Sequence, residues 1–295
     1  MIICTRTYYK QLISAWDEIK DIDNNLKKKN LVKKVSFCNH IVWKKSTIFL
    51  ITNIALAIIF LISENPDWQL MLVQIIFAFI SITNKVQFLT WIAIIRDRFS
   101  LLNYYLTTII QELDVDDILC EEINEVTNQH RRLITIVKTI NESYSIMLLL
   151  LIILDATEII THAYILAYMY FTEAFLQKEN LWSMVSIIGL ATYFSMELII
   201  LTTCIVSMCR QANFTKIIIY KTKCSPQKIE ICNAVKQTTF YLMRNTASIS
   251  PCKLFNVDYG MIYSIFTTIT NYLVIMIQLD PDLVARSRNY TTNTF

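Results

Sequence analysis

Acidic and aromatic side chains recur within two long apolar stretches of this chain. Asp155, Glu158 and His162 stand at positions i, i+3 and i+7 of one stretch, which places them on one face of a helix. Glu197 lies at a comparable depth in the next stretch, with Tyr193 one helical turn away. Ionisable groups in apolar stretches mark functional sites by default. The five side chains therefore form either a pocket for a hydrogen-bonding ligand or an interhelical polar network that tunes stability or gating.

A second polar pattern follows residues 259–280, the last apolar run of the chain. At about 100° per residue, one narrow stripe of this helix is mostly polar. The stripe consists of Ser264, Thr267, Asn271, Val274 and Gln278. A membrane-length helix with such a stripe needs water or polar partners along it, because unsatisfied polar groups are costly in hydrocarbon. The stripe is therefore either a pore wall or a hydrogen-bonded contact within a helix bundle.

Two acidic residues, Asp280 and Asp282, follow the polar stripe directly. In an oligomer, a repeated acid at this position would form a ring that favours cations at a pore mouth. In an isolated chain the same residues would belong to an ordinary solvated tail. The sequence leaves both interpretations open.

The composition requires that these elements cross a membrane. Hydrophobic residues make up 54% of the chain and charged residues 17%, and the mean hydropathy is +0.42. Only 2 Gly and 4 Pro are present, which leaves little turn chemistry for a barrel or a sandwich. The chain is therefore predicted to be an all-α integral membrane protein.

Five apolar segments are long enough to be transmembrane helices. They cover residues 46–63, 70–95, 145–171, 184–209 and 259–280. Lys85 lies inside the second segment, where its default interpretation is a side chain that snorkels to the membrane surface. The first four segments make up a predicted membrane region over residues 46–209.

The connecting segments are mostly helical and polar. Residues 1–45 form a polar flank, and residues 96–142 are too long for a structureless loop. Apolar residues recur there at helical spacing on both sides of the break at 114–117, which predicts that the two spans extend beyond the membrane as amphipathic helices that pack together. Residues 210–258 contain an amphipathic segment at about 227–248, and residues 281–295 form a short tail.

Two groups of charged residues lie in the 96–142 segment. Arg96, Asp97 and Arg98 follow the second span and are interpreted as a basic flank. His130, beside two arginines, is interpreted as an exposed helix position.

The basic residues predict the orientation. Segments 1–45, 96–142 and 210–258 hold 23 of the 27 Lys and Arg residues. The positive-inside rule therefore places the N-terminus and both long loops in the cytosol and the C-terminus outside. The predicted outer tail carries a glycosylation sequon at Asn289.

Motifs for other classes of function are missing from the sequence. It contains no phosphate-binding loop, no nucleophile with an adjacent base, no zinc-type ligand spacing and no nucleic-acid patch. No enzyme activity, cofactor, metal site or nucleic-acid partner is therefore expected. Internal repeats and Gly/Pro-broken spans are also missing, which argues against a secondary transporter.

The last apolar helix resembles a signature of insect gustatory receptors, which are relatives of the odorant receptors. That signature is Thr-Tyr, five hydrophobic residues and Gln-Phe; this chain has Asn271, Tyr272, LVIMI, Gln278 and Leu279. The flanking LFNVDYGMIYSIFTTIT, RFSLLNYYL at 98–106 and HRRLITIVKTINESYSIMLLL at 130–150 also resemble the family in order and spacing.

The resemblance implies seven spans, with a cytosolic N-terminus and an extracellular C-terminus. The five segments found here then resemble the third to seventh spans, so the chain is expected to be truncated at its N-terminus. The resemblance also implies a multi-pass plasma-membrane protein and a tetramer, formed with itself or with related receptors. Tyr272 is expected to pack against a neighbouring helix.

The function implied by the resemblance is that of a ligand-gated, non-selective cation channel for taste. A small-molecule tastant would bind near Asp155, Glu158, His162, Tyr193 and Glu197, and the 259–280 helix would line the pore with Asp280 at its mouth. The alternatives are a non-conducting modulatory subunit and a truncated receptor fragment.

Overall fold

The computed structural model describes residues 2–31, 44, 47, 51, 68–112, 116–171, 181–221 and 229–279. Within these residues every regular element is a helix, and there is no strand. The predicted span at 46–63, Asp280 and the tail at 281–295 fall almost wholly outside the described residues, so those predictions stay as they are.

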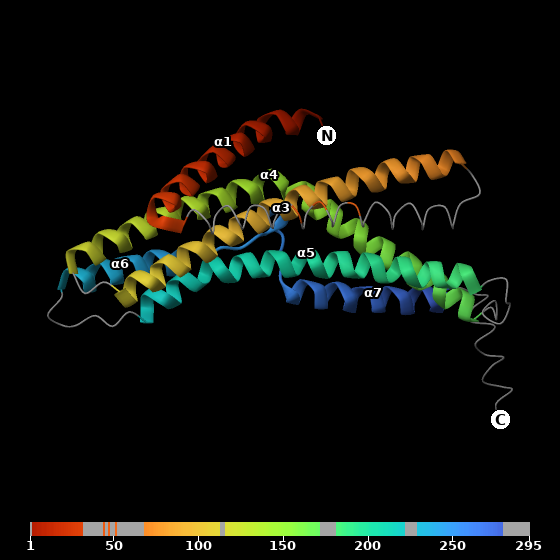
Figure 1. The fold of residues 1–295 in the computed structure, drawn as a ribbon. Coiled ribbons are helices and arrows are strands. Elements are labelled where there is room, and N and C mark those ends of the chain that lie inside the picture. The colour runs from red at the N-terminus through yellow and green to blue at the C-terminus, as the bar shows by residue number, and fades with distance from the viewer. Residues whose placement is uncertain are drawn as a thin grey trace, which may run out of the picture. The chain divides into compact units, whose positions relative to one another are not determined.

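The helices follow one another along the chain as Figure 1 shows. Their bounds are α1 (Ile2–Leu26), the π-helical turn η1 (Lys27–Leu31), α3 (Trp68–Glu112), α4 (Asp116–Phe171), α5 (Leu181–Lys221), α6 (Ile229–Arg244), the 3₁₀ turn η4 (Pro251–Lys253) and α7 (Tyr259–Leu279). The predicted span at 70–95 lies within α3, and the predicted amphipathic segment at 227–248 contains α6.

The helices α3, α4 and α5 are longer than a bilayer requires. α4 has 56 residues, which corresponds to about 84 Å, against a hydrocarbon core of about 30 Å. The predicted extension and the span at 145–171 therefore form one continuous helix. The helix α5 contains the predicted span at 184–209 and continues beyond it to Lys221.

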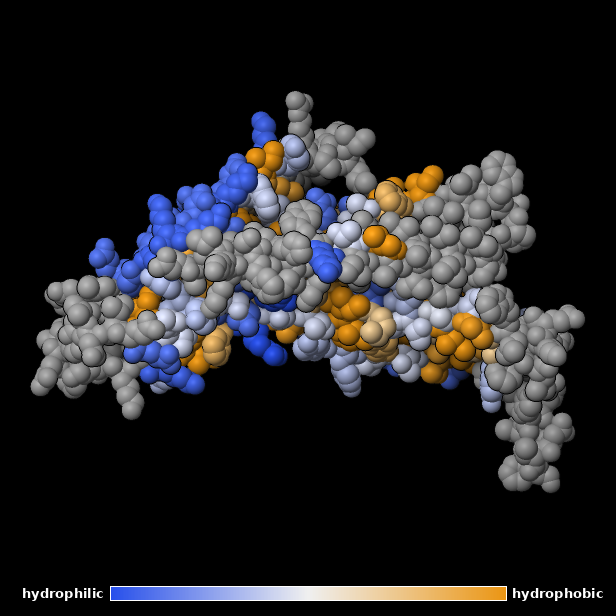
Figure 2. Space-filling model, viewed as in Figure 1, coloured by the Kyte–Doolittle hydropathy of each residue, from blue (hydrophilic) through white to orange (hydrophobic). Residues whose placement is uncertain are grey.

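Three helices among the described residues are long and apolar enough to cross a membrane. They lie at Glu121–Tyr170, Ser183–Lys221 and Tyr259–Leu279. Large apolar side chains on them are exposed, such as Leu154 at 54% and Val185 at 55%. Figure 2 shows apolar side chains gathered over α5 and α7, as expected of surfaces that contact lipid.

The chain divides into two compact units. Unit 1 comprises residues 1–47, 87–146 and 204–257, and unit 2 comprises residues 48–86, 147–203 and 258–295. Unit 1 contains α1, α6 and parts of α3, α4 and α5, and hydrophilic side chains gather over α1 in Figure 2. Unit 2 contains α7 and the remaining parts of the three long helices.

The core of unit 1 confirms the predicted helical periodicity. Nine apolar residues that recur at helical spacing on the two sides of the break at 114–117 are at most 6% exposed: Phe99, Leu102, Leu106, Ile109, Ile123, Val126, Leu133, Val137 and Ile140. The helix α1 adds Ile19 and Ile22, each 1% exposed, to this core. Apolar residues three and four apart thus form the packed face of each helix.

Arg98 and His130 are buried in this core, so the predicted surface position of His130 is wrong. The Arg98 guanidinium donates to both carboxylate oxygens of Asp23 on α1, at 2.9 and 2.7 Å. His130 Nε2 lies 3.0 Å from the backbone oxygen of Ala212, and its ring lies 5.2 Å from that of Phe99. Burial lowers the pKa of His130, which favours the neutral ring that this core accepts.

The Arg98 and Asp23 pair gives a test of how α1 is held. Asp23→Ala is expected to destabilise the protein by about 3 kcal/mol or more, because it removes the carboxylate that neutralises a buried guanidinium. The free energy of unfolding in denaturant measures this change. The control is Asp17→Ala on the same helix, where an exposed ion pair with Lys20 is lost at a cost below about 1 kcal/mol. Equal effects of the two substitutions would contradict the role of the buried pair.

Candidate functional site

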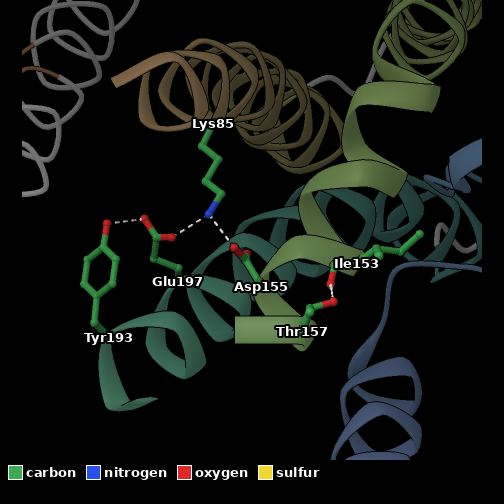
Figure 3. Close-up of polar contacts among 6 residues, drawn as sticks. All are labelled: Lys85, Ile153, Asp155, Thr157, Tyr193 and Glu197. Atoms are coloured by element: carbon green, nitrogen blue, oxygen red, sulfur yellow. Dashed lines mark hydrogen bonds and ion pairs between the residues drawn. The ribbon is translucent and has the colours of Figure 1, made fainter. Parts of the chain in front are cut away.

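Three helices of unit 2 each contribute one charged side chain to a buried cluster (Figure 3). Lys85 of α3 points between Asp155 of α4 and Glu197 of α5. The Lys85 Nζ lies 2.7 Å from Asp155 Oδ1 and 2.5 Å from Glu197 Oε2. All three side chains are at most 6% exposed. The expectation that Lys85 snorkels to the surface is therefore wrong, because two carboxylates neutralise it within the helix bundle.

Tyr193 extends the cluster along α5. Its hydroxyl donates to Glu197 Oε1 at 2.7 Å, and the spacing of four residues places both side chains on the same helix face. Glu197 therefore accepts from Lys85 with one oxygen and from Tyr193 with the other. This pairing fixes the orientation of the carboxylate and leaves it fully hydrogen-bonded on both oxygens.

Asp155 is not satisfied in the same way. Its Oδ2 is buried and has no hydrogen-bond partner among the described residues. With both carboxyls ionised, the cluster of Lys85, Asp155 and Glu197 carries one net negative charge. A buried, unpartnered carboxylate oxygen is costly, so Asp155 retains the capacity to accept a further hydrogen bond.

His162 and Glu158 lie beyond the ion pairs on α4. The His162 Nδ1 lies 2.7 Å from the backbone oxygen of Glu158 and 3.7 Å from its carboxylate. The His162 ring lies 6.0 Å from that of Phe194, whose ring lies 5.3 Å from that of Tyr193. The Glu158 side chain is 46% exposed and remains outside the buried cluster.

The structure thus brings Asp155, Tyr193 and Glu197 together as a network and links His162 to it through an aromatic contact. Sequence reasoning missed the central member, Lys85. The sequence did contain a signal for it. One apolar stretch holds a single lysine and two others hold acids, and in a membrane these groups are best neutralised by pairing with one another. The spacing within one helix carries no such information about its partners.

The helix α7 exposes its polar stripe. Ser264, Thr267, Asn271, Val274 and Gln278 are all exposed. The two buried residues of the helix, Met261 and Ile269, lie about 100° and about 180° from Gln278 around the helix axis. The face that contains Ile269 is therefore the packed face, and the polar stripe lies on a broad exposed face that also includes Tyr263, Ile275 and Leu279.

The polar side chains of this stripe differ in whether they already have a hydrogen-bond partner. Ser264 and Thr267 donate to the backbone oxygens of Gly260 and Tyr263, at 3.0 and 2.9 Å. The side-chain amides of Asn271 and Gln278 make no hydrogen bond within the part of the chain that the structure describes. In a membrane, these two amides therefore require water or a polar partner.

Tyr272 is 56% exposed on the same helix. More than half of its side chain is therefore left uncovered, and its predicted contact with a neighbouring helix stays a prediction. Asp258 begins the helix, because its Oδ1 accepts from the backbone N–H of Met261 at 2.9 Å, which is an N-cap.

Comparison with protein-family models places residues 1–282 in a family described as 7tm chemosensory receptor. The chain belongs to the 7tm chemosensory receptor family. The resemblance to insect gustatory and odorant receptors is thereby confirmed, and the receptor belongs to a family of receptors rather than of enzymes.

Two solved structures have the same fold as this chemosensory receptor. The insect olfactory receptor OR5 from Machilis hrabei matches with a TM-score of 0.58 at 10% identity, over 94% of this chain and 77% of OR5. OR5 in complex with eugenol matches with a TM-score of 0.52 at 11% identity, over 93% of this chain and 70% of OR5. The predicted all-α membrane fold is therefore confirmed. The search of curated proteins gave no match.

The buried cluster predicts a specific pattern of coupling between substitutions. Lys85→Met is expected to destabilise the receptor by roughly 3–5 kcal/mol, because it leaves two carboxylates without their buried counter-charge. Adding Asp155→Asn and Glu197→Gln to Lys85→Met removes that charge and is expected to recover part of the loss. Thermal unfolding of the receptor in detergent measures both effects.

The matched control is Lys138→Met, which removes an exposed lysine from α4. It is expected to change stability by about 0.5 kcal/mol or less. If Lys85→Met behaved like Lys138→Met, or if the neutralised triple variant were no more stable than Lys85→Met, the cluster would not hold the three helices together.

Proposed function

We propose that this chemosensory receptor is a gustatory receptor that acts as a ligand-gated, non-selective cation channel of the plasma membrane, with a cytosolic N-terminus and an extracellular C-terminus. The observation that carries the proposal is the exposed stripe of α7, in which the amides of Asn271 and Gln278 have no partner among the described residues. The family assignment supports the receptor role.

Four copies of α7 around one axis would give the amides of the stripe access to water. The amides of Asn271 and Gln278 would face a shared column of water, while the face that contains Ile269 stays packed in each subunit. Val274, 47% exposed between the two amides, would form an apolar ring that closes the path by excluding water. Asp280 would add a ring of acids at the outer mouth, which favours cations.

Ligand binding is proposed at the group of side chains around the buried cluster. Glu158, with a side chain 46% exposed, presents a carboxylate that a small molecule can reach, His162 lies beside it, and Asp155 has an unpartnered oxygen. Tyr193 and Glu197 complete the group from α5. The relative OR5 was solved with the small molecule eugenol, which supports a small-molecule tastant for this chain.

Binding at this group would change the packing between α4 and α5, because both helices contribute to it. A ligand can shift a channel towards its open state only by binding that state more tightly. A donor from the ligand to the free oxygen of Asp155 would provide such a difference if the oxygen were reachable only in the open state.

The pore wall is tested by substitutions along α7. Asn271→Ala and Gln278→Ala are expected to change cation permeability ratios or pore-block affinity by several fold, since each removes a polar contact of about 1 kcal/mol. Voltage-clamp recording of ligand-evoked current measures the change. The control is Thr270→Val, which lies about 80° from Gln278 and whose hydroxyl is satisfied by the Phe266 backbone oxygen.

Unchanged permeation and block in both alanine variants would overturn the pore wall. Surface expression and assembly without any current, for a broad panel of tastants, would instead favour the non-conducting modulatory subunit.

The ligand group is tested separately from the pore. His162→Phe keeps an aromatic ring beside Phe194 and removes the ring nitrogens. It is expected to raise the half-maximal tastant concentration by about tenfold, which corresponds to one lost hydrogen bond in an apolar site, with unchanged single-channel conductance. An unchanged dose–response curve would exclude His162 as a ligand contact.

A further inference from the structure

A cavity in unit 1 lies between α4 and α6. Its volume is about 210 Å³. The α4 wall carries Asn124, Thr127, Asn128 and Arg131, and the α6 wall carries Gln237, Thr238 and Tyr241. All seven side chains contain a hydrogen-bond donor, and no carboxylate lines the cavity.

This cavity is open to solvent, because Asn124, Asn128, Arg131 and Gln237 are exposed. The four α4 residues, spaced i, i+3, i+4 and i+7, share one face of the helix. One direct polar contact joins the helices, between the buried hydroxyls of Thr127 and Thr238 at 3.2 Å. The amides and the arginine lie at the rim of this contact and face solvent.

Arg131 has no carboxylate partner in the described part of the chain. Its guanidinium carbon lies 4.8 Å from the centre of the Tyr241 ring, a cation–π contact that holds the group at the cavity wall. Its neighbour Arg132 contrasts with it, because that guanidinium is paired with Glu18 and Asp21 on α1 at 3.2 and 2.8 Å. The adjacent residues Arg131 and Arg132 therefore differ in their partners: Arg132 is paired with two carboxylates, and Arg131 is paired with none among the described residues.

The amides around Arg131 are also available. Asn124, Asn128 and Gln237 make no side-chain hydrogen bond within the described residues. The nearest acids line a separate cavity on the other side of Asn124 and Asn128. There Glu122 is paired with Lys29, and Glu125 accepts from Gln129 at 2.8 Å. The α4–α6 cavity therefore combines one cation and several uncharged donors with no competing acid.

We propose that the α4–α6 cavity binds an anion that bears a phosphate group. The Arg131 guanidinium lies beside the Tyr241 ring and has no carboxylate partner among the described residues, and the N–H edge of a guanidinium can donate to two phosphate oxygens at once. The amides of Asn124, Asn128 and Gln237 supply donors for the remaining oxygens. The positive-inside rule places both walls in the cytosol, where phosphorylated metabolites and anionic lipid headgroups are present.

The test uses the full chain in nanodiscs of phosphatidylcholine, with two probes that separate the sources of the phosphate. One arm measures the binding of radiolabelled pyrophosphate, and the other measures by native mass spectrometry the retention of phosphatidylinositol 4,5-bisphosphate added to the nanodisc. Saturable binding in either arm is expected, and the arm that binds identifies a free phosphate or a lipid headgroup as the source.

Arg131→Gln is expected to weaken that binding by at least about tenfold, because hydrogen bonds to a charged group are lost. Arg132→Gln is the matched control and is expected to bind as the unsubstituted chain does. Gln237→Leu, on the opposite wall and exposed, is expected to weaken binding without disturbing the core, which keeps the test decisive if Arg131→Gln does not fold.

The proposal is overturned by no saturable binding in either arm. It is also overturned by binding that Arg131→Gln and Gln237→Leu leave unchanged, or by an equal loss in Arg131→Gln and Arg132→Gln.

Discussion

Lys85 lies between the carboxyls of Asp155 and Glu197, and the packing of three helices depends on that contact. Apolar contacts between long helices are non-directional and tolerate sliding, whereas a buried charge is stable only beside its counter-charge. The cluster therefore sets which residues of α3, α4 and α5 face one another in unit 2. In unit 1, Arg98 and Asp23 do the same for α1 and α3.

The polar groups of α7 are also costly in an apolar environment unless they have hydrogen-bond partners, and two of them have none among the described residues. The hydroxyls of this helix are satisfied by its own backbone, but Asn271 and Gln278 remain without partners among the described residues. In a low-dielectric environment these amides need water or a second subunit. In the proposed channel, the charged groups of the buried cluster are paired within the chain and stabilise the packing of the helices. The stripe of α7 keeps amides without partners and lines the conducting path.

Sequence reasoning succeeded where the information is local. The burial of Phe99, Leu102 and Ile123 follows from helical periodicity, and the stripe on α7 follows from positions within a single helix. It failed where a partner lies far along the chain. Arg98 pairs with Asp23, 75 residues away, and the His130 partner, Ala212, is 82 residues away. Periodicity shows which face of a helix is buried, but it does not show which helix covers that face.

The most direct test of the channel account is an electron cryomicroscopy structure of the assembled receptor in lipid. The account predicts several copies of α7 around a central path, with the amides of Asn271 and Gln278 facing that path and Ile269 facing the interior of its own subunit. Polar stripes that instead pack against other helices of the same chain, or that face lipid with no path between copies, would contradict it.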